Sequence, residues 1–204
     1  NFAAQFAADL YFGWPVNRYG YKPFCIGSQV AIVVGLGLFA SAPWIVPGRE
    51  MIVFSIATVI FAGSAGLLEV LLSPITKTIP AENSEANFMI MHSSFAAGIF
   101  AAALSTTLLL HALGDEMWQV VVLLWALLPL YNTFQFIRSP VPPTIPGHKR
   151  MNTARLLINP VFVVAFLAIF FGAASELLIV QWGSTYLEEG LGLPKVLGDV
   201  LGLC

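Results

Sequence analysis

Two acidic residues stand alone inside long apolar runs of this 204-residue chain. Glu69 is the only charged residue in 51–76, and Glu176 is the only one in 158–187. A charged side chain at the centre of a membrane helix costs about 2.5–3.5 kcal/mol on insertion scales, so acids in such places usually mark proton or substrate pathways. We therefore expect Glu69 and Glu176 to exchange protons or to bind a solute. For Glu69 the alternative is a packing role, in which its carboxyl group only contacts a neighbouring helix.

Small and polar residues accompany Glu69 at helical spacing. Steps of three and four residues place one stripe on a single helix face, and this stripe comprises Ala62, Gly66, Glu69, Ser73 and Thr76. Leucines occupy the other faces, toward lipid or neighbouring helices. The pattern predicts that the carboxylate faces protein or a water-filled cavity, with Ser73 beside it as a candidate for solute binding.

Polar and aromatic residues also follow Glu176. Gln181 and Trp182 are candidates for the lining of a solute cavity, because an indole ring stacks on sugar rings and an amide binds hydroxyl groups. Tyr186, one turn further along, fits an aromatic belt at the membrane surface at least as well. His92 stands about one turn inside another apolar run, where it is either a cavity residue or a satisfied interfacial histidine.

The remaining residues indicate neither metal nor enzyme chemistry. The two cysteines match no metal-binding or redox spacing, and no pair of histidines has ligand spacing. No nucleophile is paired with a suitable base, so we predict no enzymatic activity, no cofactor and no metal. The sequence also lacks a dense basic patch, which argues against nucleic acid as a partner.

The composition is that of an integral membrane protein. The chain is 58% hydrophobic and 10% charged, whereas soluble domains carry about 25% charged residues. A membrane helix needs about 20 mostly apolar residues. The runs that meet this need are 1–17, 22–46, 51–77, 86–113, 117–138 and 156–187. We therefore predict an all-α polytopic membrane protein.

Basic residues between these runs predict the orientation in the membrane. If the gap at 18–22 is cytoplasmic, so are the gaps at 77–86 and 138–155, and seven of the nine lysines and arginines fall in these three gaps. This bias follows the positive-inside rule for a multi-pass protein of the cell membrane, plasma or inner. The last of the three gaps is rich in proline, which favours a semi-stiff connector between two helical bundles.

The segment GWPVNRYGYK, residues 13–22, resembles the loop motif of the major facilitator superfamily, Gly-x-x-x-Asp-Arg-x-Gly-Arg/Lys-Arg/Lys. The matching positions are Gly13, Arg18, Gly20 and Lys22. Asn17 stands where the family usually has aspartate, and Tyr21 stands where a basic residue is common. The resemblance implies that these residues form the gating loop between family helices two and three.

The same alignment places the six apolar runs at family helices two to seven. The chain would then be an internal fragment of a twelve-helix protein, with an N-terminal bundle at 1–138, a cytoplasmic inter-domain linker at 139–155 and the start of the C-terminal bundle at 156–204. In this family, helices one, four, seven and ten line the central cavity. The resemblance therefore implies that Glu69, on helix four, and Glu176, on helix seven, both face it.

Two runs are similar to the fucose permease-like branch of that superfamily. They are GLLEVLLSPITKTIP on helix four, where Ser73 replaces a frequent asparagine, and GAASELLIVQWGSTYLEE on helix seven. The similarity implies alternating-access uptake of a monosaccharide, or a similar small polar solute, together with a proton. We expect a monomer whose partners are the solute, the proton and the lipid bilayer. A proton-coupled exporter of drugs or metabolites is the alternative, and a structural or sensor membrane protein is a further one.

Overall fold

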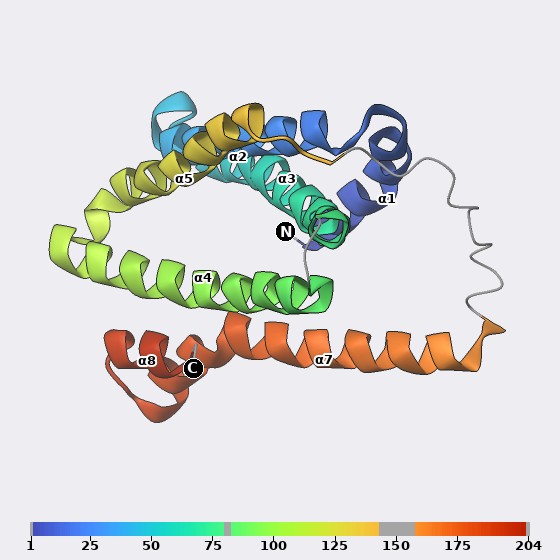
Figure 1. Ribbon diagram of the computed structural model, residues 1–204. Helices are drawn as coiled ribbons and strands as arrows, with labels where there is room; N and C mark the ends of the chain where they lie inside the picture. Colours follow the sequence, from blue (N-terminus) through green and yellow to red (C-terminus); the bar gives the residue numbers. More distant parts are fainter. Residues whose placement is uncertain (1, 80–82, 143–157, 203–204) are drawn as a thin grey trace. The chain divides into compact units, whose positions relative to one another are not determined.

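The computed structural model describes residues 2–79, 83–142 and 158–202. Every regular element in these residues is helical (Figure 1). The helices are α1 (Phe2–Tyr19), α2 (Tyr21–Ile45), α3 (Glu50–Thr78), α4 (Ser84–Leu113), α5 (Trp118–Arg138), α7 (Pro160–Thr185) and α8 (Lys195–Gly202), with a 3₁₀ turn η1 (Asp115–Met117) and a π-helical turn η2 (Tyr186–Gly190). The all-α prediction is therefore confirmed for the described part of the chain.

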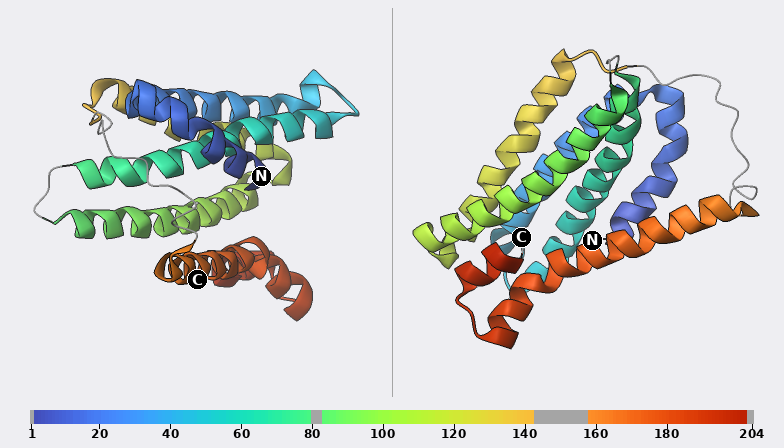
Figure 2. Two further views of the ribbon diagram at one scale, coloured as in Figure 1. Left: turned by 90° about the vertical axis from the view of Figure 1, so that its right-hand side faces the viewer. Right: turned by 60° about the horizontal axis from the view of Figure 1, so that its bottom comes forward.

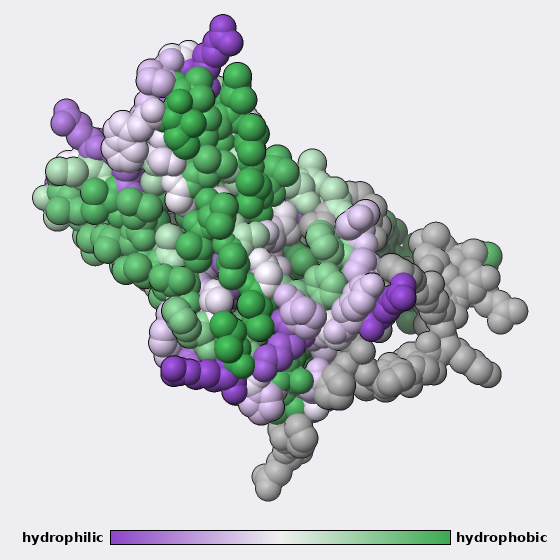
Figure 3. Space-filling view, turned by 90° about the horizontal axis from the view of Figure 1, so that it is seen from above, coloured by the Kyte–Doolittle hydropathy of each residue, from purple (hydrophilic) through white to green (hydrophobic). Residues whose placement is uncertain are grey.

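Five of these helices are long and apolar enough to cross a membrane, namely α2, α3, α4, α5 and α7. This finding supports the multi-pass membrane protein predicted from composition. The first predicted span forms the helix α1, which is not among the five, because polar residues such as Gln5 and Asp9 interrupt its apolar run. Large apolar side chains remain exposed on the helices, and they cover much of the face seen in Figure 3.

The chain divides into two compact units. Unit 1 comprises Asn1–Phe95 and Leu109–Pro146, and unit 2 comprises Ala96–Leu108 and Gly147–Cys204. Unit 1 thus contains α1, α2, α3, α5 and the two ends of α4, whereas unit 2 contains the middle of α4 together with α7 and α8. The predicted linker at 139–155 lies largely outside the described residues.

α2 is the central helix of unit 1. It packs against α3 and α5, and α1 packs on α3 (Figure 2). Glycine lets the backbones approach, since a Cβ added to Gly66 of α3 would stand 2.8 Å from the Cβ of Gln5 in α1. The buried core residues of α1, α2 and α3 are Val16, Cys25, Leu67, Leu68, Leu71 and Ile75. This core fixes the orientation of α3, the helix that carries Glu69.

In unit 2, α8 returns to pack on α7. A Cβ added to Gly183 of α7 would stand 2.8 Å from the carbonyl oxygen of Gly202 in α8, so the absence of a side chain permits this approach. η2 and the turn that follows it reverse the chain, with Gly192 in the left-handed region at φ 68°. The apolar helix α7 therefore carries a short helix packed near its carboxyl end.

Candidate functional site

Glu69 is exposed on α3, nine residues before the end of the helix at Thr78. At 1.5 Å per residue this is about 13 Å from that end, well within the thickness of a bilayer. Within the described residues, its carboxylate makes no hydrogen bond or ion pair. The neighbouring Leu68 and Leu71 are buried in the core of unit 1. The acid is therefore available to water, a proton or a solute.

In unit 1, α3 turns its leucines toward the protein and its carboxylate away from it. Of the two predicted surroundings of Glu69, protein or a water-filled cavity, unit 1 does not supply the first, and the cavity stays a prediction. The physical reason is the balance of burial energies. Burying a leucine side chain stabilises a core by about 1.5–3 kcal/mol, whereas burying an unpaired carboxylate costs several kcal/mol.

The small and polar stripe of α3 does not form one continuous surface. Gly66 is buried against α1. The hydroxyl of Thr76 lies 2.8 Å from a carbonyl oxygen of its own helix and 3.1 Å from the sulfur of Met91 in α4. Glu69 and the half-buried Ser73 are therefore the polar members of the stripe that remain open to a solute.

His92 is exposed on α4 and contacts an aromatic ring of the same helix. Its ring meets Phe88 edge to face, with 4.4 Å between the centroids. The ammonium group of Lys77, at the end of α3, lies 4.7 Å from the centroid of the same Phe88 ring. Because His92 contacts the same ring as Lys77, its surroundings fit a histidine at the membrane interface with its contacts satisfied. A role of His92 in lining a solute cavity stays a prediction.

The segment GWPVNRYGYK is almost entirely helical, whereas the sequence predicted a loop over 18–22. α1 includes Gly13, Asn17 and Arg18, and α2 includes Lys22. Gly20 alone separates the two helices, with φ 87°. This left-handed backbone conformation favours glycine and lets α1 end within one residue.

Lys22 ties the start of α2 to the end of α5. Its Nζ donates hydrogen bonds to the carbonyl oxygens of Ile137 (3.0 Å) and Ser139 (3.1 Å). A cation at a helix C-terminus satisfies carbonyl groups that lack an intrahelical partner and interacts favourably with the helix dipole. The guanidinium of Arg18 lies 5.4 Å from the centroid of the Tyr19 ring. The motif thus contributes a contact between helices that its sequence pattern did not reveal.

Glu176 lines a pocket of about 210 Å³ within unit 2. The residue lies nine positions before the end of α7, about 13 Å along the helix axis. The other described lining residues are apolar or glycine: Ala96, Ile99, Phe100, Ile179, Val180 and Gly202. Gln181 and Trp182 are exposed and do not line this pocket. Glu176 is therefore a lone carboxylate against apolar walls.

Asp199 of α8 is an acidic residue that sequence reasoning missed. Its Oδ2 accepts a hydrogen bond from Thr107 Oγ1 of α4 (2.7 Å), and its Oδ1 accepts one from Ser184 Oγ of α7. Both carboxylate oxygens are occupied, and three helices of unit 2 meet at this side chain. The signal that could have found it is a lone acid in the otherwise uncharged segment 196–203.

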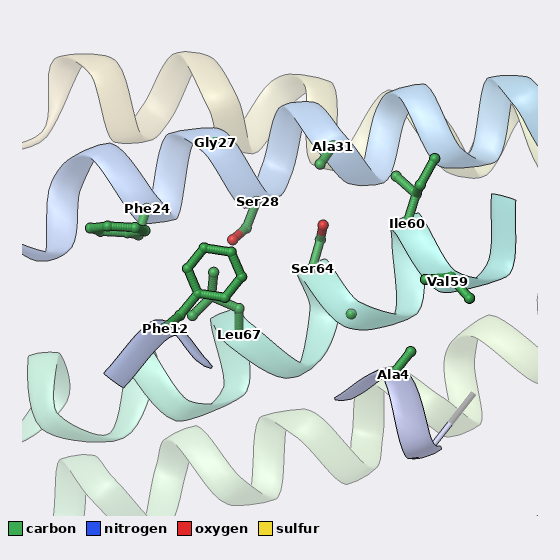
Figure 4. Close-up of a pocket in the computed structure, with 11 residues that line it drawn as sticks. Ala4, Phe12, Phe24, Gly27, Ser28, Ala31, Val59, Ile60, Ser64 and Leu67 are labelled. Carbon is green, nitrogen blue, oxygen red and sulfur yellow. The ribbon is translucent and has the colours of Figure 1, made fainter. Parts of the chain in front are cut away.

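A larger groove, of about 340 Å³, lies between α1, α2 and α3 in unit 1. The described lining residues are apolar except for Ser28 of α2 and Ser64 of α3, whose hydroxyl groups point into the space between these helices (Figure 4). The Oγ of Ser28 has no hydrogen-bond partner in the part of the chain that the structure describes, although the residue is only 4% exposed. The predicted solute and proton residues Glu69, Ser73, His92, Glu176, Gln181 and Trp182 are not among its lining residues.

Nowhere in 2–79, 83–142 and 158–202 do three or more His, Cys, Asp or Glu side chains come together to form a metal site. Comparison of the chain with family models, with curated proteins and with solved structures finds no match. The activity of this chain must therefore be inferred from its membrane helices and from the two acids that they carry.

Proposed function

We propose that this chain is part of a secondary active transporter of the major facilitator type, which takes up a monosaccharide or similar small polar solute with a proton by alternating access. The observation that carries the proposal is the pair of acids, Glu69 and Glu176, each exposed on a helix apolar and long enough to span a membrane. Ionisable residues within membrane helices mark proton and substrate pathways. In the described structure neither carboxylate has a hydrogen-bond or ion-pair partner, so both can meet a ligand.

Glu69 is assigned the coupled proton. An ionised carboxylate accepts hydrogen bonds from solute hydroxyl groups, whereas a protonated one donates a hydrogen bond and carries no charge. Movement of an ionised side chain through an apolar barrier costs more free energy than movement of a neutral one. In this proposal the change between outward-facing and inward-facing states takes place with Glu69 protonated, and this requirement couples solute movement to proton movement.

Glu176 and the residues that follow it are assigned to solute binding. Gln181 and Trp182 are exposed one to two turns beyond Glu176, where an amide and an indole can bind a hydroxylated ring. Ser73, half-buried one turn after Glu69, and the exposed His92 are the further candidates for the cavity. The side chains of these four residues supply hydrogen-bond donors and acceptors, and none of them is a lysine or arginine that would neutralise Glu69 or Glu176.

Lys22 is assigned a gating contact on the cytoplasmic side. The segments 18–22, 77–86 and 138–155 hold most of the basic residues, and the positive-inside rule therefore places them in the cytoplasm. The bonds from Lys22 to the end of α5 join two helices at that side. A contact of this kind can be broken and remade between transport states at modest cost, because its hydrogen bonds are exposed.

The apolar lining around Glu176 favours a second candidate function, a proton-coupled exporter of drugs or metabolites with the same fold. A carboxylate beside Phe100 and Val180 suits an organic cation with an apolar body better than a hydrophilic sugar. The variant Trp182→Ala separates the two functions. Sugar uptake should fall when the stacking surface is lost, whereas export of an apolar cation should stay near the wild-type rate.

The test is solute-induced proton movement by the full-length protein in cells that lack their own sugar uptake. A panel of monosaccharides is added while the external pH is recorded. One sugar should make the medium more alkaline with the wild type, and Glu69→Gln should abolish the change. Glu85→Gln, at an exposed acid in the first turn of α4, should behave like the wild type. No pH change with any sugar, despite normal membrane insertion, would contradict sugar symport.

A further inference from the structure

Several hydroxyl groups of these helices donate to the carbonyl oxygen four residues earlier, and Ser28 does not share this bond. The residues with this bond are Ser41, Ser55, Thr76, Ser94, Ser105, Thr133 and Ser175. This bond satisfies a hydroxyl within its own helix. The Oγ of Ser28 is buried and has no partner among the described residues. A buried hydroxyl without a partner is destabilising, so a ligand that supplies a partner gains affinity there.

Ser28 faces the groove between α1, α2 and α3. Figure 4 shows its hydroxyl and that of Ser64 pointing into the same space from two neighbouring helices. Phe12 and Phe24 line the groove with their rings edge to face, 6.0 Å between centroids. The groove volume of about 340 Å³ falls in the range of small-molecule sites, and a cavity of about 150 Å³ already holds benzene. There is thus room for a ring and a polar substituent.

We propose that this groove binds a small, uncharged ring compound with one or two hydrogen-bonding groups, such as an aromatic alcohol. The lining residues that the structure describes include no charged side chain, which argues against an ion. Two serine hydroxyls cannot satisfy the many hydroxyl groups of a free sugar, and each unsatisfied group lowers affinity. A lipid acyl chain would cover the apolar walls but leave Ser28 without a partner. The site shares no lining residue with the proposed proton and solute residues.

The test uses two probes that differ by one hydroxyl group, 4-fluorobenzyl alcohol and 4-fluorotoluene. Each is titrated against the full-length protein in lipid nanodiscs and followed by ¹⁹F NMR. Each probe partitions into the nanodisc lipid to the same extent with every protein variant. Saturable binding that differs between variants therefore measures binding of the probe in the groove. The alcohol should bind about three- to tenfold more tightly than the toluene, which is the effect of one net hydrogen bond.

Three variants locate the site. Ser28→Ala should make the affinities of the two probes equal while keeping the groove. Gly27→Leu should abolish binding of both, because Gly27 lines the groove and a Cβ there meets nothing within 4 Å, so the side chain can enter the space. Gly37→Leu is the matched control on the same helix, since Gly37 is equally unobstructed but does not line the groove. It should bind both probes like the wild type.

Several results would overturn the proposal. Equal affinities of the wild type for both probes would identify an apolar groove suited to lipid, and the absence of saturable binding would exclude a site. Binding of a monosaccharide that is lost in Ser28→Ala would assign the groove to sugars instead. Removal of an unpartnered hydroxyl should leave the Tm of the unliganded Ser28→Ala variant unchanged or higher, so a lower Tm would mean that this hydroxyl has a partner. None of these results depends on the outcome of the sugar-transport test.

Discussion

Gly35 of α2 lies directly against Phe61 of α3. A Cβ added to Gly35 would stand 2.8 Å from the Cβ of Phe61 and 2.9 Å from its backbone nitrogen. Two residues further along α2, Gly37 has nothing within 4 Å of the same hypothetical atom. One helix therefore offers both a close contact and an open position, which makes the packing of α2 on α3 directly testable.

Gly35→Ala should lower the free energy of unfolding by about 1–3 kcal/mol, because the added methyl group pushes α2 and α3 apart. Gly37→Ala should be neutral or raise it by up to about 1 kcal/mol, because alanine favours the helix more than glycine does. Denaturant unfolding in detergent, followed by circular dichroism, measures both variants. Equal stabilities of the two would show that α2 and α3 are not in close contact at Gly35.

Lys22→Met should lower the free energy of unfolding by about 1 kcal/mol, because it removes the cation from the end of α5 and keeps the length of the side chain. Lys22→Arg is the matched control and should retain most of the stability, since it keeps the charge and the donors. If Lys22→Met unfolds at the same denaturant concentration as the wild type, the hydrogen bonds from Lys22 to the Ile137 and Ser139 carbonyl groups do not contribute to the free energy of unfolding.

Thr107→Val should lower the free energy of unfolding by about 1–3 kcal/mol, because it removes one hydrogen bond to a charged group and leaves an Asp199 oxygen without that partner. Ser105→Ala is the control on the same helix. The Ser105 hydroxyl bonds only to carbonyl groups of α4 itself, so its loss should have little effect on stability. Similar losses in both variants would mean that Asp199 does not hold α4 and α8 together.

Glu69→Gln should be no less stable than the wild type. An exposed carboxylate without a partner contributes no native contact, so its neutralisation removes nothing from the folded state. The measurement is denaturant unfolding in detergent, with Glu85→Gln as the reference for loss of an exposed acid. A fall of more than about 1 kcal/mol in Glu69→Gln alone would favour the packing role of this residue over transport.

Hydropathy predicted the long helices closely because each is set by its own sequence. The run 51–77 became α3 at Glu50–Thr78, and 117–138 became α5 at Trp118–Arg138. In lipid a helix satisfies its own backbone groups, so length and apolar content are sufficient to predict it. Glu69 is a candidate by the same logic, since a lone charge in an apolar run is visible without any tertiary information, and its role stays a prediction.

Features that depend on contacts between helices were not predictable in this way. The partner of Lys22 is more than a hundred residues away in sequence, at the end of α5. Asp199 is on a short helix whose two hydroxyl partners come from α4 and α7. Glu69 is exposed because Leu67, Leu68 and Leu71 form the core of unit 1. The stripe of small residues on α3 did not predict which face of the helix would be buried. These features depend on how the helices pack against one another, and the periodicity of the sequence alone does not predict that packing.

The most direct test of the proposed transport separates proton coupling from solute exchange. Full-length protein in proteoliposomes is given an imposed pH gradient, and accumulation of the responding monosaccharide is measured beside exchange of labelled for unlabelled sugar without a gradient. Glu69→Gln should exchange sugar but not accumulate it, whereas wild type and Glu85→Gln should do both. Gradient-driven accumulation by Glu69→Gln at the wild-type level would contradict the assignment of Glu69 as the proton carrier.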